Sequence, residues 1–144
     1  MKKLAMILMS VFCIQSATFA DNDRLIQFSQ LPVEAQQTVN DHFSGKKVAY
    51  TMVDPGFGRT YEVVFDDATK IEFHKNGQWK EVDMNMQAVP QVFIPEAIQA
   101  YVNTNFPDAY ICHIDIKRGN KEVELSNGLE LKFNSRDRVV EIDD

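Results

Sequence analysis

The chain has 144 residues, of which 44% are hydrophobic and 25% charged, and its formal net charge is −6. This composition is typical of a globular protein and excludes a disordered chain. The acidic balance argues against nucleic acid as a partner and against adsorption to anionic lipid, because both require a basic patch.

Residues 1–20 have the three parts of a secretory signal peptide. Lys2 and Lys3 form a basic start, residues 4–14 form an apolar run, and small residues lead to a predicted cleavage after Ala20. The apolar run is too short for a bilayer of ~30 Å, and we expect no membrane insertion of the mature chain. A lipid anchor at Cys13 is left open. The sequence therefore predicts an exported protein, periplasmic or secreted.

The mature chain is expected to begin with a polar, mobile lead-in over residues 21–30. A helix over 32–43 follows, opened by a proline and carrying apolar residues every four positions. Alternating apolar residues, with Asn76-Gly77 as a hairpin signal, then predict four strands. They cover residues 47–53, 61–65, 70–75 and 78–83.

The same order of elements is predicted a second time. Residues 85–91 link the two parts, and a helix is expected over 95–106. The strands that follow cover residues 110–116, 121–125, 129–134 and 138–143.

These two parts align as an internal duplication. Residues 31–48 match 94–111 at an offset of 63, and residues 63–83 match 123–143 at an offset of 60. The change of offset places three extra residues of the first unit within 54–60. We therefore predict an α+β fold made of two units, 21–84 and 85–144, each one helix followed by a four-stranded antiparallel sheet. Whether the two sheets merge or stay separate is left open.

No pattern in the chain predicts chemistry. His42, His74 and His113 form no metal-ligand spacing, and Cys112 sits in an alternating strand pattern typical of a small buried residue. No acid, base and nucleophile come together in a catalytic motif. We expect no enzyme, no cofactor and no metal site.

Two places are candidates for protein contact. The longer loop carries Phe57 between two glycines, with Asp54 and Arg59 on either side. Phe57 either meets a partner or tucks back onto the sheet, and deletion of 56–58 is expected to leave the fold intact. Trp79 either anchors a partner on the open face of the sheet or belongs to the core.

The chain resembles the PepSY-like proteins. The resemblance rests on Leu-Pro and Ile-Pro before the two helices and on the Gly-x-Trp-x-Glu-Val-Asp pattern that ends at Asp83. It spans residues 31–143, although Asp137 and Val139 replace the glycine and tryptophan in the second unit. These exported bacterial proteins are related in fold to the beta-lactamase inhibitor protein, which binds its enzyme across a concave sheet and two loops. PepSY domains proper are associated with restraining secreted peptidases.

The resemblance implies an inhibitor-like sheet, and no inhibitory residue carries over individually. We therefore expect an exported, non-enzymatic protein-binding module, an inhibitor or regulator of a secreted or periplasmic peptidase or other envelope enzyme. The alternative is a structural or envelope-stress protein that self-associates through its open sheet face.

Overall fold

The computed structural model describes residues 23–144, so the expected signal peptide and Cys13 lie outside the described residues. The first unit comprises β1 (Arg24–Ile26), a 3₁₀ helix (Phe28–Gln30), α1 (Val33–His42), β2 (Val48–Asp54), β3 (Thr60–Phe65), β4 (Lys70–His74) and β5 (Trp79–Asp83). The second unit comprises a 3₁₀ helix (Gln91–Phe93), α2 (Glu96–Asn105), β6 (Ile111–Lys117), β7 (Asn120–Leu125), β8 (Glu130–Phe133) and β9 (Val139–Asp143).

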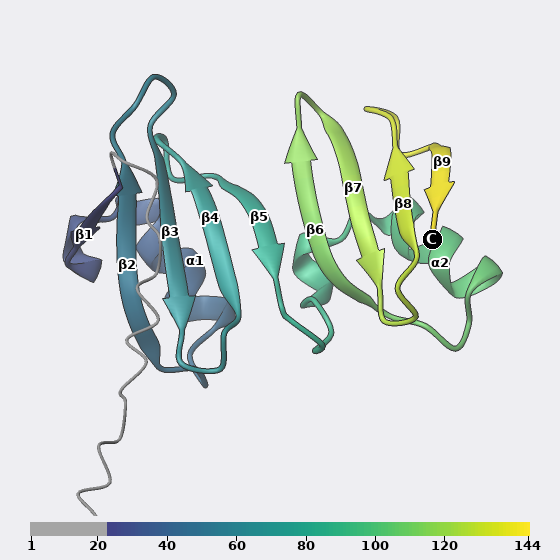
Figure 1. Ribbon diagram of the computed structural model, residues 1–144, viewed down its shortest axis with the longest axis horizontal. Coiled ribbons are helices and arrows are strands. Elements are labelled where there is room, and N and C mark those ends of the chain that lie inside the picture. Colours follow the sequence, from purple (N-terminus) through teal and green to yellow (C-terminus); the bar gives the residue numbers. More distant parts are fainter. Residues whose placement is uncertain (1–22) are drawn as a thin grey trace, which may run out of the picture.

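The two predicted sheets merge into one antiparallel sheet of nine strands, ordered β1 to β9 as in the chain (Figure 1). The junction is the pairing of β5 with β6, in which Val82 lies opposite Ile114. In this arrangement β5 covers the edge of β6 just as β1 covers the edge of β2. Merging satisfies the backbone hydrogen bonds of two edges that would otherwise be open.

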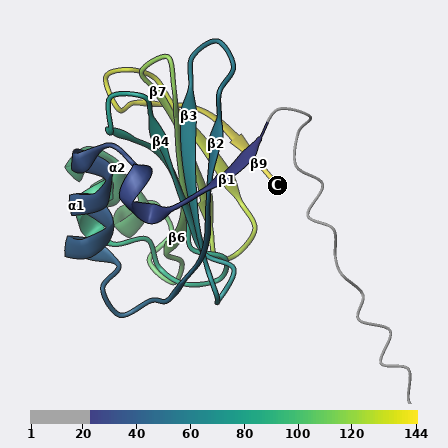
Figure 2. The ribbon, with the colours of Figure 1, turned by 90° about the vertical axis from the view of Figure 1, so that its left-hand side faces the viewer.

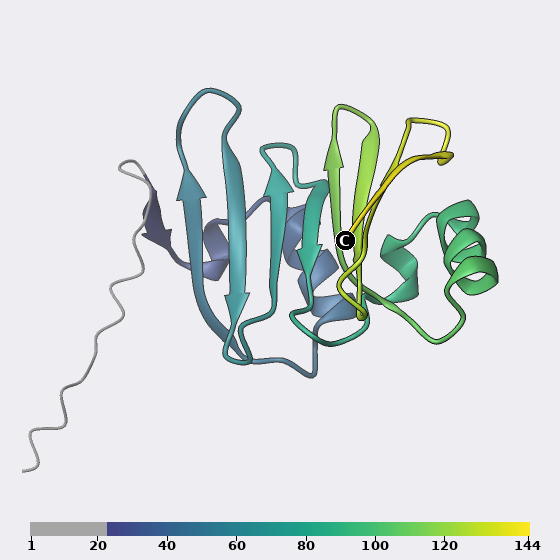
Figure 3. The same ribbon diagram turned by 45° about the vertical axis from the view of Figure 1, so that its right-hand side comes forward.

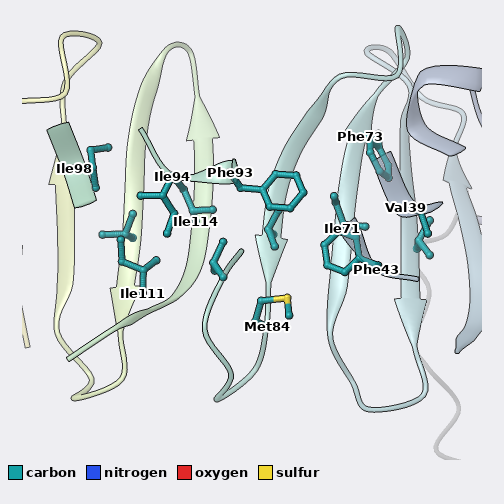
Figure 4. Close-up of a cluster of buried hydrophobic side chains, with 14 of the residues drawn as sticks. Val39, Phe43, Ile71, Phe73, Met84, Phe93, Ile94, Ile98, Ile111 and Ile114 are labelled. Carbon is teal, nitrogen blue, oxygen red and sulfur yellow. The ribbon is translucent and has the colours of Figure 1, made fainter. Parts of the chain in front are cut away.

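Both helices lie on the same face of the sheet, which confirms the α+β architecture of two helix-and-sheet units (Figure 2). Their apolar stripes, Ala35 and Val39 in α1 and Ile98 and Val102 in α2, are buried against the inward residues of the strands. Phe93, from the segment between the units, lies in the middle of this core (Figure 4). The core is therefore shared by the two units.

The duplication extends to the irregularities of the backbone. The register shifts between Val48 and Tyr50 in β2, and 63 positions later it shifts between Ile111 and His113 in β6. The register also shifts between Glu72 and Phe73, where β4 pairs with β5. It shifts again 60 positions later, between Lys132 and Phe133, where β8 pairs with β9. The two short 3₁₀ helices are also 63 positions apart.

The lead-in is not the mobile segment that the sequence predicted. Residues 24–26 form β1, with Leu25 opposite Met52 on β2, and Ile26 and Phe28 pack against the core. Main-chain hydrogen bonding to a free strand edge does not depend on side-chain pattern, and a strand of only three residues, Arg24–Ile26, is too short to show a clear alternation.

The helices differ from their predicted ranges by one residue at each end. Pro32 and Pro95 are N-caps with extended ψ angles of 142° and 138°, and the helices start one residue later. Each proline carbonyl accepts the first helical hydrogen bond, from Gln36 and Gln99 respectively.

Candidate functional site: the open face of the sheet

The face of the sheet opposite the two helices is uncovered by them and is strongly charged (Figure 2). Strand register and alternation place eleven carboxylates there: Asp54, Glu62, Glu72, Glu81, Asp83, Asp115, Glu122, Glu124, Glu130, Glu141 and Asp143. The same strands place four lysines there: Lys70, Lys80, Lys117 and Lys132.

The excess negative charge of the described residues lies on this face. Of 21 acidic and 15 basic residues, Asp21, Lys2 and Lys3 precede residue 23, which leaves 20 and 13, an excess of seven. The eleven carboxylates and four lysines give an excess of seven, and Asp23, which lies beside Asp54 and Glu62, raises it to eight. The remaining described residues carry a formal charge of +1, so the negative field of the molecule originates on the open face.

Five of these carboxylates form one row across the sheet, which we call the acidic row. Each lies directly opposite the next on strands β3 to β7: Glu62, Glu72, Glu81, Asp115 and Glu122. Neighbouring strands are ~4.8 Å apart, and like charges directly opposite one another destabilise a sheet. The row therefore costs stability in the isolated protein.

The pKa values in the row reflect this crowding. Burial raises the pKa of Glu62, and burial followed by a hydrogen bond with Glu81 raises the pKa of Glu72. The Glu81 pKa falls to about 2, chiefly because Oε1 is 2.7 Å from Nε2 of His113. The same bond raises the pKa of His113. His113 therefore neutralises Glu81, and the neighbouring members Glu72 and Asp115 pair with Lys80 and Lys117.

Asp115 lies between Glu81 and Glu122 in the acidic row and is 7% exposed. Its Oδ2 pairs with Nζ of Lys117 at 3.1 Å. Its Oδ1 has no hydrogen-bond partner among the described residues. A buried carboxylate oxygen without a donor is unfavourable, which adds to the cost of the row.

Trp79 lies on the helix side of the sheet, so the alternative that placed it on the open face is wrong. Strict alternation would place Trp79 on the face of the sheet opposite to that of Val82. The register shift within β5 instead pairs Trp79 with Phe73, which is fully buried. The Trp79 ring packs edge-on against Phe93, with 5.3 Å between centroids. A bulge inserts one extra residue and so reverses which face the next residue occupies.

The β2–β3 loop projects at the same end of the sheet as the β6–β7 turn (Figures 1 and 3). Phe57 is fully exposed at its tip and does not fold back onto Tyr61. Oδ1 of Asp54 accepts a hydrogen bond from the backbone N–H of Gly56 at 2.9 Å, so this carboxylate orders the loop itself. Arg59 is exposed. The loop brings Phe57 and Arg59 together and leaves Trp79 on the other side of the sheet.

Within residues 23–144, no group of three or more histidine, cysteine, aspartate or glutamate side chains is arranged to hold a metal ion. None of the helices in this range is long and apolar enough to cross a membrane. Cys112 is buried, and burial raises the pKa of its thiol.

Alternation in the sequence could have located most of the open-face carboxylates one strand at a time. The acidic row was missed because it depends on the register between strands and on the merging of the two sheets at β5 and β6. No signal in a single sequence reports that register.

Residues 59–141 match the family described as "Putative beta-lactamase-inhibitor-like, PepSY-like". No curated protein matches the chain. Among solved structures, a "putative periplasmic protein" of the DUF2874 family from Bacteroides vulgatus is 42% identical, with a TM-score of 0.84 over 88% of this chain and 100% of that one. A "putative calcium-regulated periplasmic protein" from Bacteroides thetaiotaomicron is 44% identical, with a TM-score of 0.83 and the same coverage. A third, a "putative periplasmic protein of unknown function" from B. vulgatus, is 32% identical, with a TM-score of 0.80 over 85% of this chain and 99% of that one.

Proposed function

The chain belongs to the PepSY-like, beta-lactamase-inhibitor-like family, and from this premise we propose that it is an exported, non-enzymatic protein-binding module that regulates a secreted or envelope enzyme. The open face of the sheet is its binding surface. The similarity to proteins described as periplasmic supports export.

The observation that carries the proposal is the acidic row. The row places like charges opposite one another and leaves Oδ1 of Asp115 without a donor, although Glu72, Glu81 and Asp115 each have one cationic partner. A partner that supplies lysine or arginine side chains would relieve both costs. Charge complementarity of this kind speeds encounter and selects the partner.

The partner's contact surface is therefore basic, and binding weakens as salt screens the charges. Phe57, at the end of the same sheet, provides an apolar contact beside this charged surface. Together they combine a charged face with an aromatic side chain, a residue type that commonly carries binding energy.

One relative is named as calcium-regulated. Because the described residues hold no group of three or more candidate metal ligands, we carry no calcium dependence over to this chain.

The test compares two triple variants with the same change of net charge. Glu62→Gln/Glu72→Gln/Glu122→Gln removes three members of the acidic row. Asp41→Asn/Asp66→Asn/Asp108→Asn removes three exposed carboxylates that lie off the open face. Each protein is immobilised and exposed to the exported fraction of the source cells at low salt. We expect the wild type and the control to retain the same basic protein and the row variant to lose it.

The captured protein is then assayed with and without the wild-type chain. A change in its enzymatic activity that the row variant does not produce supports a regulatory role. Equal capture by both triple variants would show that net charge alone is responsible, and the open face would no longer be the binding surface.

Self-association through the open face is less favoured. Two copies face to face would oppose surfaces that each carry an excess of eight negative charges, and like-charge juxtaposition is strongly unfavourable. We expect a monomer by sedimentation at micromolar concentration. A dimer that dissociates in the row variant more than in the control would support the self-association alternative instead.

A further inference from the structure

The junction between the two units contains a cleft of about 850 Å³ at one end of the sheet. Pairing between β5 and β6 stops at Glu81 and Asp115, whereas β6 continues beside β7 as far as Lys117 and Asn120. The two strands run apart toward that end (Figure 1). His74 lines the cleft from the first unit, and the β6–β7 turn lines it from the second. The cleft therefore exists only because the two units merge.

The lining of the cleft reverses the charge of the rest of the molecule. Its five cations are Lys80, Lys117, Arg118, Lys121 and Lys132. Glu122 is its one carboxylate among the described residues, and Ile116 and Val140 supply apolar surface. The volume falls within the ~300–1,000 Å³ typical of small-molecule sites, which are mostly apolar with a few polar groups.

The lysines are held in place but retain hydrogen-bonding capacity. Each pairs with a carboxylate that does not line the cleft: Lys80 with Glu72 at 3.3 Å, Lys117 with Asp115 at 3.1 Å, Lys121 with Asp137 at 2.6 Å, and Lys132 with Glu141 at 3.1 Å and Asp143 at 3.4 Å. An ammonium group has three donors, so these bonds leave donors on every lysine for a ligand. The ion pairs also limit the freedom of the side chains, which lowers the entropy lost on binding.

Arg118 at the rim has features that the fold does not explain. Its backbone is left-handed, with φ +52°, and it precedes Gly119 in the two-residue β6–β7 turn. Such turns favour Asn-Gly, and an ordinary side chain in this conformation costs about 1 kcal/mol. Arg118 is exposed, and its guanidinium has no hydrogen-bond or ion-pair partner among the described residues. The turn accounts for the positive φ but does not require an arginine side chain, and a strained position that carries a charged group without a partner is a candidate functional position.

We propose that this cleft binds an amphiphilic anion, a carboxylate carried on a short apolar body. Arg118 and the free lysine donors hold the carboxylate, and the apolar body lies against Ile116 and Val140. The site goes beyond the proposed protein-binding function, because its ligand is a small anion. The two surfaces adjoin, since Glu122 of the acidic row also lines the cleft, and Lys80 and Lys117 pair with two other members of the row. Two sources share this chemistry: a fatty acid, and the free carboxyl terminus of an apolar peptide.

The experiment is a titration followed by the backbone amide signals of the ¹⁵N-labelled protein. Octanoate and octanol form one matched pair, and N-acetyl-leucyl-leucine and its amide form another. We expect at least one carboxylate to shift the amides of 117–121 and 132–134 and to bind at least about tenfold more tightly than its neutral counterpart. Response to octanoate alone identifies a fatty acid as the source, and response to the peptide alone identifies a peptide terminus.

Arg118→Asn provides the decisive variant, because asparagine suits the left-handed turn and the variant should fold at least as well as the wild type. We expect its affinity for the responding carboxylate to fall about tenfold. The control, Arg24→Gln/Lys47→Gln, removes two exposed cations of the first unit that do not line the cleft, and should bind normally. Equal binding of the neutral counterparts, an equal loss in the control, unchanged affinity in Arg118→Asn, or no response to either carboxylate would overturn the proposal.

Discussion

Ala68 and Gly128 occupy equivalent turns of the two units, with φ +68° and +88°, and each donates its N–H to the residue three positions earlier. Alanine in this conformation costs about 1 kcal/mol that glycine avoids, although glycine gains entropy in the unfolded chain. We predict that Ala68→Gly raises the free energy of unfolding by about 0.5 kcal/mol and that Gly128→Ala lowers it by about 1 kcal/mol. Urea denaturation followed by the fluorescence of the single tryptophan measures both. The two substitutions should change the free energy of unfolding in opposite directions. A Cβ on Gly128 would meet no atom within 4 Å, so the backbone conformation alone sets the cost of that substitution.

Gly77 combines a positive φ of +89° with close packing. A Cβ here would lie 3.0 Å from Cβ of Glu34 and 3.1 Å from Cβ of Pro32, at the start of α1. We predict that Gly77→Ala costs at least ~1 kcal/mol more than Gly128→Ala, because it adds a steric clash to the backbone strain. The same denaturation experiment compares the two. Equal costs would mean that the start of α1 shifts away from the added methyl group without loss of stability.

Trp79 connects the two units through Phe93, which also stacks on Phe43 with 5.7 Å between centroids. We predict that Trp79→Ala lowers the free energy of unfolding by about 2–4 kcal/mol, because a large aromatic contact is lost. Val139→Ala, the equivalent change in the second unit, should cost about 1 kcal/mol. Circular dichroism in urea follows both, since the first variant has no tryptophan. A fully stable Trp79→Ala protein would contradict the core position.

The β2–β3 loop is the element in which the two units differ most. Residues 55–59 connect β2 to β3, whereas two residues, Arg118 and Gly119, connect β6 to β7. Deleting 56–58 alone would leave Pro55 in a two-residue turn, where the equivalent Arg118 has φ +52° and proline is confined to about −65°. The suitable variant therefore replaces 55–59 with Asn-Gly.

We predict that this exchange leaves the free energy of unfolding within ~0.5 kcal/mol of the wild type, since Phe57 is fully exposed to solvent within residues 23–144. Affinity for the captured partner should fall at least ~10-fold, equivalent to about 1.4 kcal/mol. Unfolding experiments and a binding titration measure the two quantities. Unchanged affinity in the folded variant would exclude the loop as a contact site.

At the scale of the whole molecule, the charged face predicts how stability depends on pH. Glu62, Glu72 and Glu130 have raised pKa values, so their contributions to stability are fully present below about 4.5 and are lost as pH rises through the folded values. The raised pKa of His113 also makes the free energy of unfolding fall as pH rises, in the range above 6.5. Glu81, with a folded pKa of about 2, contributes above 4.5 and loses that contribution as pH falls toward 2.

The chain should therefore be more stable at pH ~5.5 than at pH ~8, because the acidic row repels itself less when it is partly protonated. Urea denaturation at the two pH values tests this. Glu62→Gln/Glu72→Gln/Glu130→Gln should flatten the dependence, whereas Asp41→Asn/Asp66→Asn/Asp108→Asn should leave it unchanged. Greater stability at pH 8 would contradict the direction of these pKa shifts.

The sequence by itself determined the duplication, the two helices and the order of eight of the nine strands, because these depend on local apolar periodicity and turn residues such as Asn76-Gly77. It also determined that Phe57 lies in a loop lengthened by three residues. Helix ends were displaced by one residue, since proline can serve either as first residue or as cap.

Only the tertiary structure decided that the sheets merge, that β1 exists and that Trp79 faces the core. Each of these depends on a contact between distant residues: a strand edge that accepts any backbone, or a bulge at Lys80 that reverses alternation between Trp79 and Glu81. The acidic row and the cationic cleft have the same origin. Their side chains are scattered along the chain and come together through strand register, which one sequence does not encode locally.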